Sequence, residues 1–230
     1  MDLLNSILHP IHKEGHKFIA IAAGVTFVAM FLSDALFWLC LIITLWVVYF
    51  FRDPVRTVPT RSGLVVSPGD GIVSKITKAA PPIELDMGDE PMTRVSIFLN
   101  VFNVHVNRIP VAGKISKLYY HAGKFLNASL DKASEDNERQ SVLIKTEDGK
   151  NVVVVQIAGL IARRIVCTLQ NDQQVKTGER FGIIRFGSRV DVYLPEGISP
   201  LVAEGQVAVG GETIIADFQS SEQNRETVKI

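Results

Sequence analysis

Two strand-like runs separated by a Gly-Ser pair make up residues 177–195, TGERFGIIRFGSRVDVYLP. The runs extend from Phe181 to Phe186 and from Arg189 to Leu194, and both are rich in the branched and aromatic residues typical of strands. Glycine between two strands commonly marks a bulge or a tight bend, because it lacks the Cβ that restricts other backbones. The stretch therefore predicts two strands that meet at Gly187-Ser188.

The Gly187-Ser188 pair also has the composition of a bond that a protein can cut in itself. A serine hydroxyl can attack the carbonyl carbon of the preceding residue and convert the amide into an ester. Glycine at that position removes the Cβ that would crowd the attack and lets the peptide leave its relaxed geometry. Loss of the ester by β-elimination leaves dehydroalanine, which hydrolyses to a pyruvoyl group. Such a ketone can form a Schiff base with an amine and accept electrons from a departing carboxylate.

The motif Gly178-Glu-x-Phe-Gly-x-x-x-Phe-Gly-Ser188 resembles the self-cleavage region of phosphatidylserine decarboxylase proenzymes. The likeness is strongest to the short bacterial and archaeal-type form, which has Phe-Gly-Ser-Arg where the long form has Gly-Ser-Thr. It extends from about Ser67 to Phe218. The resemblance implies a pyruvoyl-dependent carboxy-lyase that converts phosphatidylserine to phosphatidylethanolamine and CO2.

In that family the prosthetic group is covalently bound pyruvate, which the resemblance assigns to Ser188. Ser188 would be both the nucleophile of self-cleavage and the precursor of the pyruvoyl group. Cleavage between Gly187 and Ser188 would give a β chain of residues 1–187 and an α chain of residues 188–230. The implied partners are a membrane phospholipid and these two chains bound to each other, and homo-oligomer formation stays open.

Asp70 lies in Ser-Pro-Gly-Asp-Gly, residues 67–71, between two short β-like runs. An aspartate in such a place is most often a turn residue that accepts hydrogen bonds from its own backbone. In the similar family, however, the acidic residue of this motif belongs to the self-cleavage machinery. The resemblance therefore implies a catalytic role for Asp70.

His105 lies in the apolar run of residues 100–110 and occupies the family's His-x-x-x-x-Pro position. A lone histidine in such a run is usually a hydrogen-bonded, partly buried residue. The resemblance implies instead a residue beside the pyruvoyl group that transfers protons, in maturation or in reprotonation of the product. The long form has a second histidine where this chain has Arg108. Either His105 serves both steps or His121 contributes, while Arg108 is a candidate for the lipid phosphate or for a solvated salt bridge.

Acidic and basic residues number 24 each, so no global field predicts a nucleic-acid partner. The two cysteines, Cys40 and Cys167, do not make a disulfide framework. No Cys-x-x-Cys or His-x-x-x-His spacing predicts a metal site.

Nearly every residue from Phe18 to Phe51 is apolar, with a break at Ser33-Asp34. One helix of that length would measure roughly 50 Å, well beyond a hydrocarbon core of about 30 Å. We therefore expect two helices, 18–32 and 35–51, with Ser33 or Asp34 as the cap of the second. Basic residues flank the run on both sides: Lys13, Lys17, Arg52 and Arg56. This pattern predicts a hairpin in the cell membrane with the following domain on the cytoplasmic side; full crossing and shallow insertion both stay open.

Beyond the apolar run, short β-like runs alternate with turn signals, which is typical of a mainly β domain. The segments 67–73 and 204–216 look like the two halves of a biotinyl-like domain, a barrel-sandwich hybrid with some helix. The most polar stretch, 126–141, predicts a solvated loop. It contains Asn-Glu-Arg, residues 137–139, which matches a family signature near the active site, and a lid over the lipid headgroup is one interpretation.

The sequence thus divides into five expected segments. They are a cytoplasmic N-terminal segment 1–17, a membrane hairpin 18–51, a linker 52–64, a pyruvoyl-dependent decarboxylase domain 65–218 and a polar tail 219–230.

Two other hypotheses have to be weighed against the enzyme. A membrane-anchored lipoyl-like adaptor without catalysis would suit the glycine-rich turns, but the chain lacks its modifiable lysine and its coiled-coil heptads. It would also leave Gly187-Ser188 and His105 unexplained. The same enzyme acting on an ether-linked serine phospholipid differs only in the lipid tails, which the sequence does not specify.

Overall fold

The computed structural model describes residues 9–123, 136–159, 164–185, 187–223, 225 and 227–228. The chain divides into two compact units, Met1–Val55 and Arg56–Ile230. The division falls inside the predicted linker 52–64. The second unit is mainly β, as the sequence predicts.

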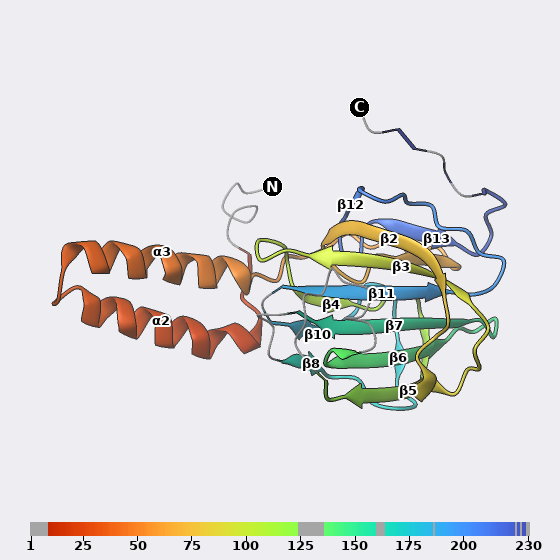
Figure 1. Cartoon of the computed structure of the whole chain (residues 1–230), viewed down its shortest axis with the longest axis horizontal. Coiled ribbons are helices and arrows are strands. Elements are labelled where there is room, and N and C mark those ends of the chain that lie inside the picture. The colour runs from red at the N-terminus through yellow and green to blue at the C-terminus, as the bar shows by residue number, and fades with distance from the viewer. Residues whose placement is uncertain are drawn as a thin grey trace. The chain divides into compact units, whose positions relative to one another are not determined.

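A helical hairpin makes up most of the first unit (Figure 1). A 3-10 turn, η1 (Lys13–Gly15), leads into α2 (His16–Ala29), and α3 (Asp34–Phe50) follows after a short turn. The predicted break at Ser33-Asp34 is confirmed, although the Ser33 side chain makes no capping hydrogen bond. Most large side chains of both helices are exposed and apolar, because the sequence offers almost no polar face.

Polar contacts hold the hairpin together at two levels. Inside it, the hydroxyls of Thr26 and Thr44 lie 2.8 Å apart. At its open end, the amide of His12 donates to the carbonyl of Phe51 at 2.9 Å. The helices have 14 and 17 residues. In the described part of the chain, no helix combines the length and the hydropathy of a membrane span.

Eight antiparallel strands form the main sheet of the second unit (Figure 1). Their order across the sheet is β12 (Val207–Ala208), β2 (Gly71–Ala79), β3 (Met92–Leu99), β11 (Ser188–Leu194), β7 (Asn151–Ala158), β6 (Arg139–Lys145), β5 (Gly113–His121) and β9 (Gln174–Val175). Strand β11 is central, since β3 and β7 pair with it on its two sides.

Two smaller sheets complete the described β structure. The three-stranded sheet has the order β4 (Val106–Arg108), β10 (Arg180–Ile184) and β8 (Ile165–Cys167), and β1 (Leu64–Val66) pairs with β13 (Ile214–Asp217). The main core lies between the eight-stranded and three-stranded sheets and includes Ile97, Val154 and Val190 from the former and Phe181 and Ile184 from the latter.

A second, smaller core covers the other face of the main sheet. Leu143, Val155 and Tyr193 of the sheet pack there with Leu85 of the 3-10 turn η2 (Ile83–Leu85). Side chains alternate across a strand, so β11 directs Val190, Val192 and Leu194 towards the main core and Tyr193 towards the second one.

The two strands predicted on either side of Gly187 are confirmed, but they do not pair with each other. Strand β10 belongs to the three-stranded sheet and β11 to the eight-stranded sheet. The chain therefore passes from one layer of the main core to the other between β10 and β11. The predicted turn before Gly71 is also confirmed, and β6 and β7 form an antiparallel hairpin.

Candidate active site

Gly187 has a left-handed backbone, with φ at +68°. A Cβ built at this position would meet only Val101 Cγ1, at 3.8 Å, which is an ordinary contact. The conformation, rather than crowding, therefore requires glycine here, because a side chain disfavours positive φ. Of the two reasons expected for a glycine here, the freedom of its backbone is the one that this conformation reflects.

Ser188 is the first residue of β11 and is fully buried. Its Cα pairs with Leu99 of β3 on one side and with Ala158 of β7 on the other. Its hydroxyl has no hydrogen-bond partner among the residues that the structure describes. A buried hydroxyl without a partner is costly and is a common sign of function.

His105 lies directly against the Gly187-Ser188 junction and is fully buried. The backbone amide of Gly187 donates to His105 Nε2 at 3.2 Å, and Nδ1 lies 3.0 Å from the carbonyl oxygen of Asn103. Because Nε2 accepts, it carries no proton, and Nδ1 is the donor to Asn103. The neutral ring thus presents its basic nitrogen to the residue whose carbonyl would be attacked.

Asp70 has both carboxylate oxygens engaged. Arg56 Nη2 lies 2.6 Å from Oδ2, and the amide of Gly210 donates to Oδ1 at 2.8 Å. These contacts join the linker and the β12–β13 turn to the turn before β2. The contacts given above for His105 involve other residues, Gly187 and Asn103. The role of Asp70 in self-cleavage stays a prediction from the family motif.

The two alternatives to His105 lie in different surroundings. Arg108 is buried, and its Nη1 donates to the carbonyl of Gly178 at 3.0 Å, so it is neither solvated nor in an exposed salt bridge there. The ladder His121–Arg139–Ile157–Arg189 separates His121 from β11 by three strand spacings, which is roughly 14 Å. That row also lies on the sheet face opposite to Ser188, so His121 does not reach the junction.

The prediction of a solvated loop at residues 126–141 is wrong for the C-terminal end of that stretch. Residues 124–135 lie outside the described residues, but Asn137, Glu138 and Ser141 are buried. Asn137 Nδ2 donates to the carbonyl of Ala158 at 2.7 Å, which fixes the strand end beside Ser188. The Asn-Glu-Arg signature is therefore part of the scaffold of the site.

Glu138 continues this scaffold. Its Oε1 accepts from the Tyr120 hydroxyl at 3.0 Å and from the backbone amide of Ile165 at 3.1 Å. Loss of solvation, together with the hydrogen bond to the Glu138 carboxylate, raises the pKa of the Tyr120 hydroxyl. One carboxylate thus joins β5, β6 and β8.

Sequence reasoning missed a buried pair of amides beside the junction. Gln156 and Asn107 are fully buried, and Gln156 Nε2 donates to Asn107 Oδ1 at 2.8 Å. The only signal was a glutamine in the apolar run VVVVQIA, where a strand residue that faces a core is expected to be apolar.

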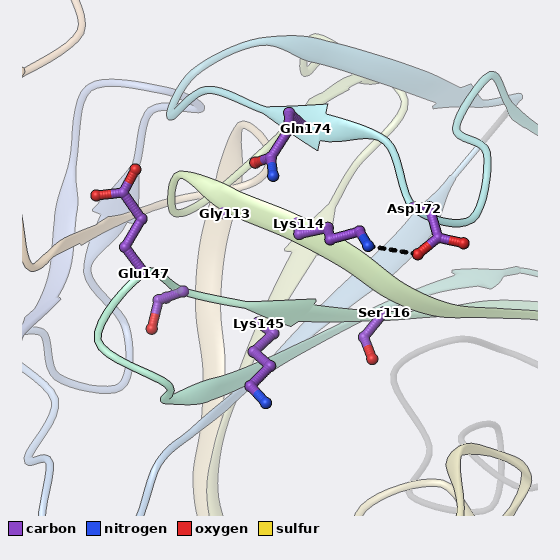
Figure 2. A pocket seen from close by; sticks show the side chains of 8 residues that line it. Gly113, Lys114, Ser116, Lys145, Glu147, Asp172 and Gln174 are labelled. Carbon is purple, nitrogen blue, oxygen red and sulfur yellow. Dashed lines mark ion pairs between the residues drawn. The ribbon is translucent and has the colours of Figure 1, made fainter.

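A groove of about 360 Å³ lies away from the junction, near the start of β5 and the end of β6 (Figure 2). Lys114 of β5 faces Lys145 of β6 in register, at the opposite end of the strand pair from His121. Lys114 and Asp172 form an exposed ion pair of 2.6 Å across this groove (Figure 2). Exposed pairs of this kind contribute little stability. Among the described residues, no group of His, Cys, Asp and Glu could hold a metal ion.

Comparisons with known proteins identify the family of the chain. A family model described as "Phosphatidylserine decarboxylase" matches residues 43–216. The chain is 56% identical over 225 residues to the phosphatidylserine decarboxylase proenzyme of Cereibacter sphaeroides, which covers 98% of this chain and 97% of that protein. It is 54% identical to the proenzyme of Ruegeria pomeroyi, over 95% of this chain and 100% of that protein. It is 59% identical to the proenzyme of Rickettsia typhi, over 95% of this chain and 94% of that protein. The chain belongs to the phosphatidylserine decarboxylase family.

Proposed function

We propose that the chain cuts itself between Gly187 and Ser188 and becomes a pyruvoyl-dependent enzyme that converts phosphatidylserine to phosphatidylethanolamine and CO2. The observation that carries this proposal is a buried serine hydroxyl directly after a left-handed glycine, whose amide is bonded to the unprotonated nitrogen of His105. The names of the relatives support the same activity and the same proenzyme state.

Self-cleavage needs only residues of this chain and one water molecule. Ser188 Oγ bonds to the carbonyl carbon of Gly187, the peptide C–N bond breaks, and the hydroxyl proton passes by way of His105 Nε2 to the freed nitrogen. Removal of the Ser188 Hα and rupture of its Cβ–Oγ bond then release the Gly187 carboxylate and leave dehydroalanine. Addition of water and loss of ammonia complete the pyruvoyl carbonyl.

The surroundings of Ser188 fit a pyruvoyl group. The strand that would carry it is paired on both sides, by β3 and β7, so the new chain end would stay in place. Because Oγ would leave with the Gly187 carboxylate, the ketone carbon would be the Cα of Ser188, which lies between β3 and β7. When bound, such a group supplies an electron sink for the departing carboxylate. His105 Nε2 is placed to hold a proton there and deliver it to the product.

For the fold we propose the biotinyl-like barrel-sandwich hybrid. Its support is the close approach of the two glycine-rich turns. The amide of Ser67 donates to the carbonyl of Thr213, and the amide of Gly211 donates to the carbonyl of Ser67, both at 2.8 Å. Gly210 also lies against Gly69, where a Cβ would meet the Gly69 backbone at 3.1 Å.

Intact-mass spectrometry of the purified protein tests the proposed self-cleavage. We expect two chains that correspond to residues 1–187 and 188–230, with a pyruvoyl terminus on the smaller one. Ser188→Ala should stay uncut and inactive, whereas the exposed Ser116→Ala, a matched control on β5, should mature normally. A wild-type chain that stays intact while it releases CO2 from phosphatidylserine would overturn the proposal. Assays on diacyl and diether phosphatidylserine would separate the two lipid classes.

We also propose that the hairpin attaches the enzyme to the cell membrane, with the β unit on the cytoplasmic side. The exposed apolar side chains of the hairpin, among them Phe31 and Leu32 in the turn and Trp38 of α3, support insertion of the hairpin tip. The basic residues at the open end support a cytoplasmic location of that end.

The two tryptophans of the chain, Trp38 and Trp46, both lie in α3, so intrinsic tryptophan fluorescence reports on the hairpin alone. Trp38 lies nearer the tip, eight residues from Trp46, which is about 12 Å along a helix. The variant Trp46→Phe keeps Trp38, and Trp38→Phe keeps Trp46. In vesicles whose lipids carry bromine at defined depths, the fluorescence of Trp38 should be quenched by deeper bromines than the fluorescence of Trp46. Equal and shallow quenching of both variants would contradict insertion of the tip.

A further inference from the structure

Gln156 lies on the same sheet face as Ser188, two positions along the β7–β11 pair. The Cα of Gln156 pairs with Val190 of β11, and Ala158 pairs with Ser188. Both Val190 and Ala158 belong to the main core. Since side chains two residues apart share a face, Gln156 points into the same core as Ser188.

The Gln156 side chain crosses from the eight-stranded sheet to the three-stranded sheet. Its Nε2 donates to Asn107 of β4, and a Cβ built on Gly182 of β10 would lie 3.1 Å from the same nitrogen. Asn107 is in turn two residues after His105, whose ring is bonded to Gly187. One hydrogen bond therefore ties β7, which pairs with the strand of Ser188, to β4, which begins directly after His105.

Stability alone does not account for this pair. On the core-facing side of the main sheet, the described part of the chain leaves two buried polar atoms without a partner, Ser188 Oγ and Gln156 Oε1. Each such atom costs about 1–3 kcal/mol, and an apolar side chain of similar volume would avoid that cost. Both atoms belong to one face of the β7–β11 pair, two positions apart, and unsatisfied groups of this kind are retained at functional sites.

We infer that Gln156 and Asn107 form a positioning pair that holds His105 Nε2 on the Gly187-Ser188 junction during self-cleavage. This rests on the proposed self-cleavage. The pair fixes the separation of the two sheets at the place where the base and the junction must meet. Without the hydrogen bond, β4 and the preceding His105 can shift relative to β11, and a displacement of about 1 Å can cost as much as a hundredfold in rate.

The test is a time course of self-cleavage in freshly synthesised full-length chain. Gln156→Met and Asn107→Leu keep the side-chain size but remove the hydrogen bond, and each should slow cleavage by about tenfold or more. The exchanged pair, Gln156→Asn with Asn107→Gln, restores an amide–amide bond of the same total length. It should recover most of the wild-type rate, which a merely structural role would not explain.

Gln140→Met is the matched control. Gln140 is also a buried glutamine, pairs directly with Gln156 across β6 and β7, and donates to the carbonyl of Ser141 within its own strand. Among the described residues its side chain makes no bond between the sheets, so the Gln140→Met variant should cleave within about twofold of the wild-type rate. All variants are compared well below their melting temperatures, so that unfolded chain does not contribute.

The outcomes separate this inference from the proposed function. If wild type is cut and both single variants are cut at the wild-type rate, the positioning role is wrong while self-cleavage stands. If the folded exchanged pair stays as slow as the single variants, the role is also wrong. A wild-type chain that is never cut would instead remove the proposed function itself.

Discussion

The backbone of Gly187 is the feature that sets the geometry of the junction at the residue scale. Its left-handed conformation directs its amide to His105 Nε2. An L-residue with a side chain would pay about 1–2 kcal/mol for this conformation. A glycine suits this position because the chain passes from one sheet to another between β10 and β11.

Gly187→Ala should therefore fold but cut itself at least about tenfold more slowly, because alanine favours a backbone that turns the amide away from His105. The measurement is the intact mass of the chain as a function of time after synthesis. Gly197→Ala is the matched control, since Gly197 has φ of +77°, open space around it and a place beyond the other end of β11. Equal cleavage rates in the two variants would show that the left-handed glycine is not needed.

Single residues also show what the sequence could and could not reveal about the site. The family motifs pointed to Ser188 and His105, and the structure brings these two together. Gln156 was hidden because its partner, Asn107, lies 49 residues away along the chain. The partners of Asp70 come from residues 56 and 210, which no local pattern connects.

At the scale of elements, the short turn η2 is tied to β6 through one carboxylate. Arg139 donates to the two oxygens of Glu84 at 2.8 and 3.2 Å, and the Ser141 hydroxyl donates to Oε1 at 3.1 Å. Burial opposes ionisation of Glu84, but the hydrogen bonds from Arg139 and Ser141 outweigh it. The pKa of Glu84 is therefore below its usual value of 4.5.

A carboxyl with a lowered folded pKa stabilises the protein above its unfolded pKa and loses that contribution as the pH falls through the folded value. Glu84→Gln should lower the free energy of unfolding by about 1.5–3 kcal/mol at pH 7. The gap to wild type should narrow below about pH 4.5. Urea unfolding of the full chain in detergent, followed by circular dichroism over a pH series, measures this.

Asp148→Asn provides the comparison for Glu84. The Asp148 carboxyl also has a lowered pKa, through hydrogen bonds from Lys150 and Thr146, but it is half exposed at a hairpin turn. Solvent screens such a pair, so its loss should change the unfolding free energy little. If both variants behaved alike, the buried Glu84 cluster would not be the stronger link.

The elements on both sides of the junction followed from the sequence, because apolar and branched residues gather there in two separate runs. Their assignment to different sheets did not follow, since strand pairing depends on partners far along the chain. The charges of residues 126–141 predict a solvated loop, but in its described end two charged side chains are buried by pairing, Arg139 with Glu84 and Glu138 with Tyr120.

At the scale of the whole molecule, the segment after the cut is interleaved with the segment before it. Strand β11 lies between β3 and β7, β12 pairs with β2, and β13 pairs with β1. Every described strand of residues 188–230 therefore has its partner in residues 1–187. Cleavage breaks one peptide bond but none of these pairings.

We expect the two chains of the mature enzyme to stay together without any covalent link. Size-exclusion chromatography in detergent should give one species that contains both chains, and only denaturant should separate them. The uncut Ser188→Ala variant should elute at the same volume. Recovery of a free 188–230 chain under native conditions would contradict the interleaved arrangement.

Complete burial of Ser188 has one more consequence. A lipid headgroup cannot touch this position while Ser188 is buried. In the proposed maturation, scission would free the Gly187 end to withdraw, so that a single event would both create the reactive carbonyl and open a path to it. The uncut precursor would thus be closed to phosphatidylserine as well as chemically inert.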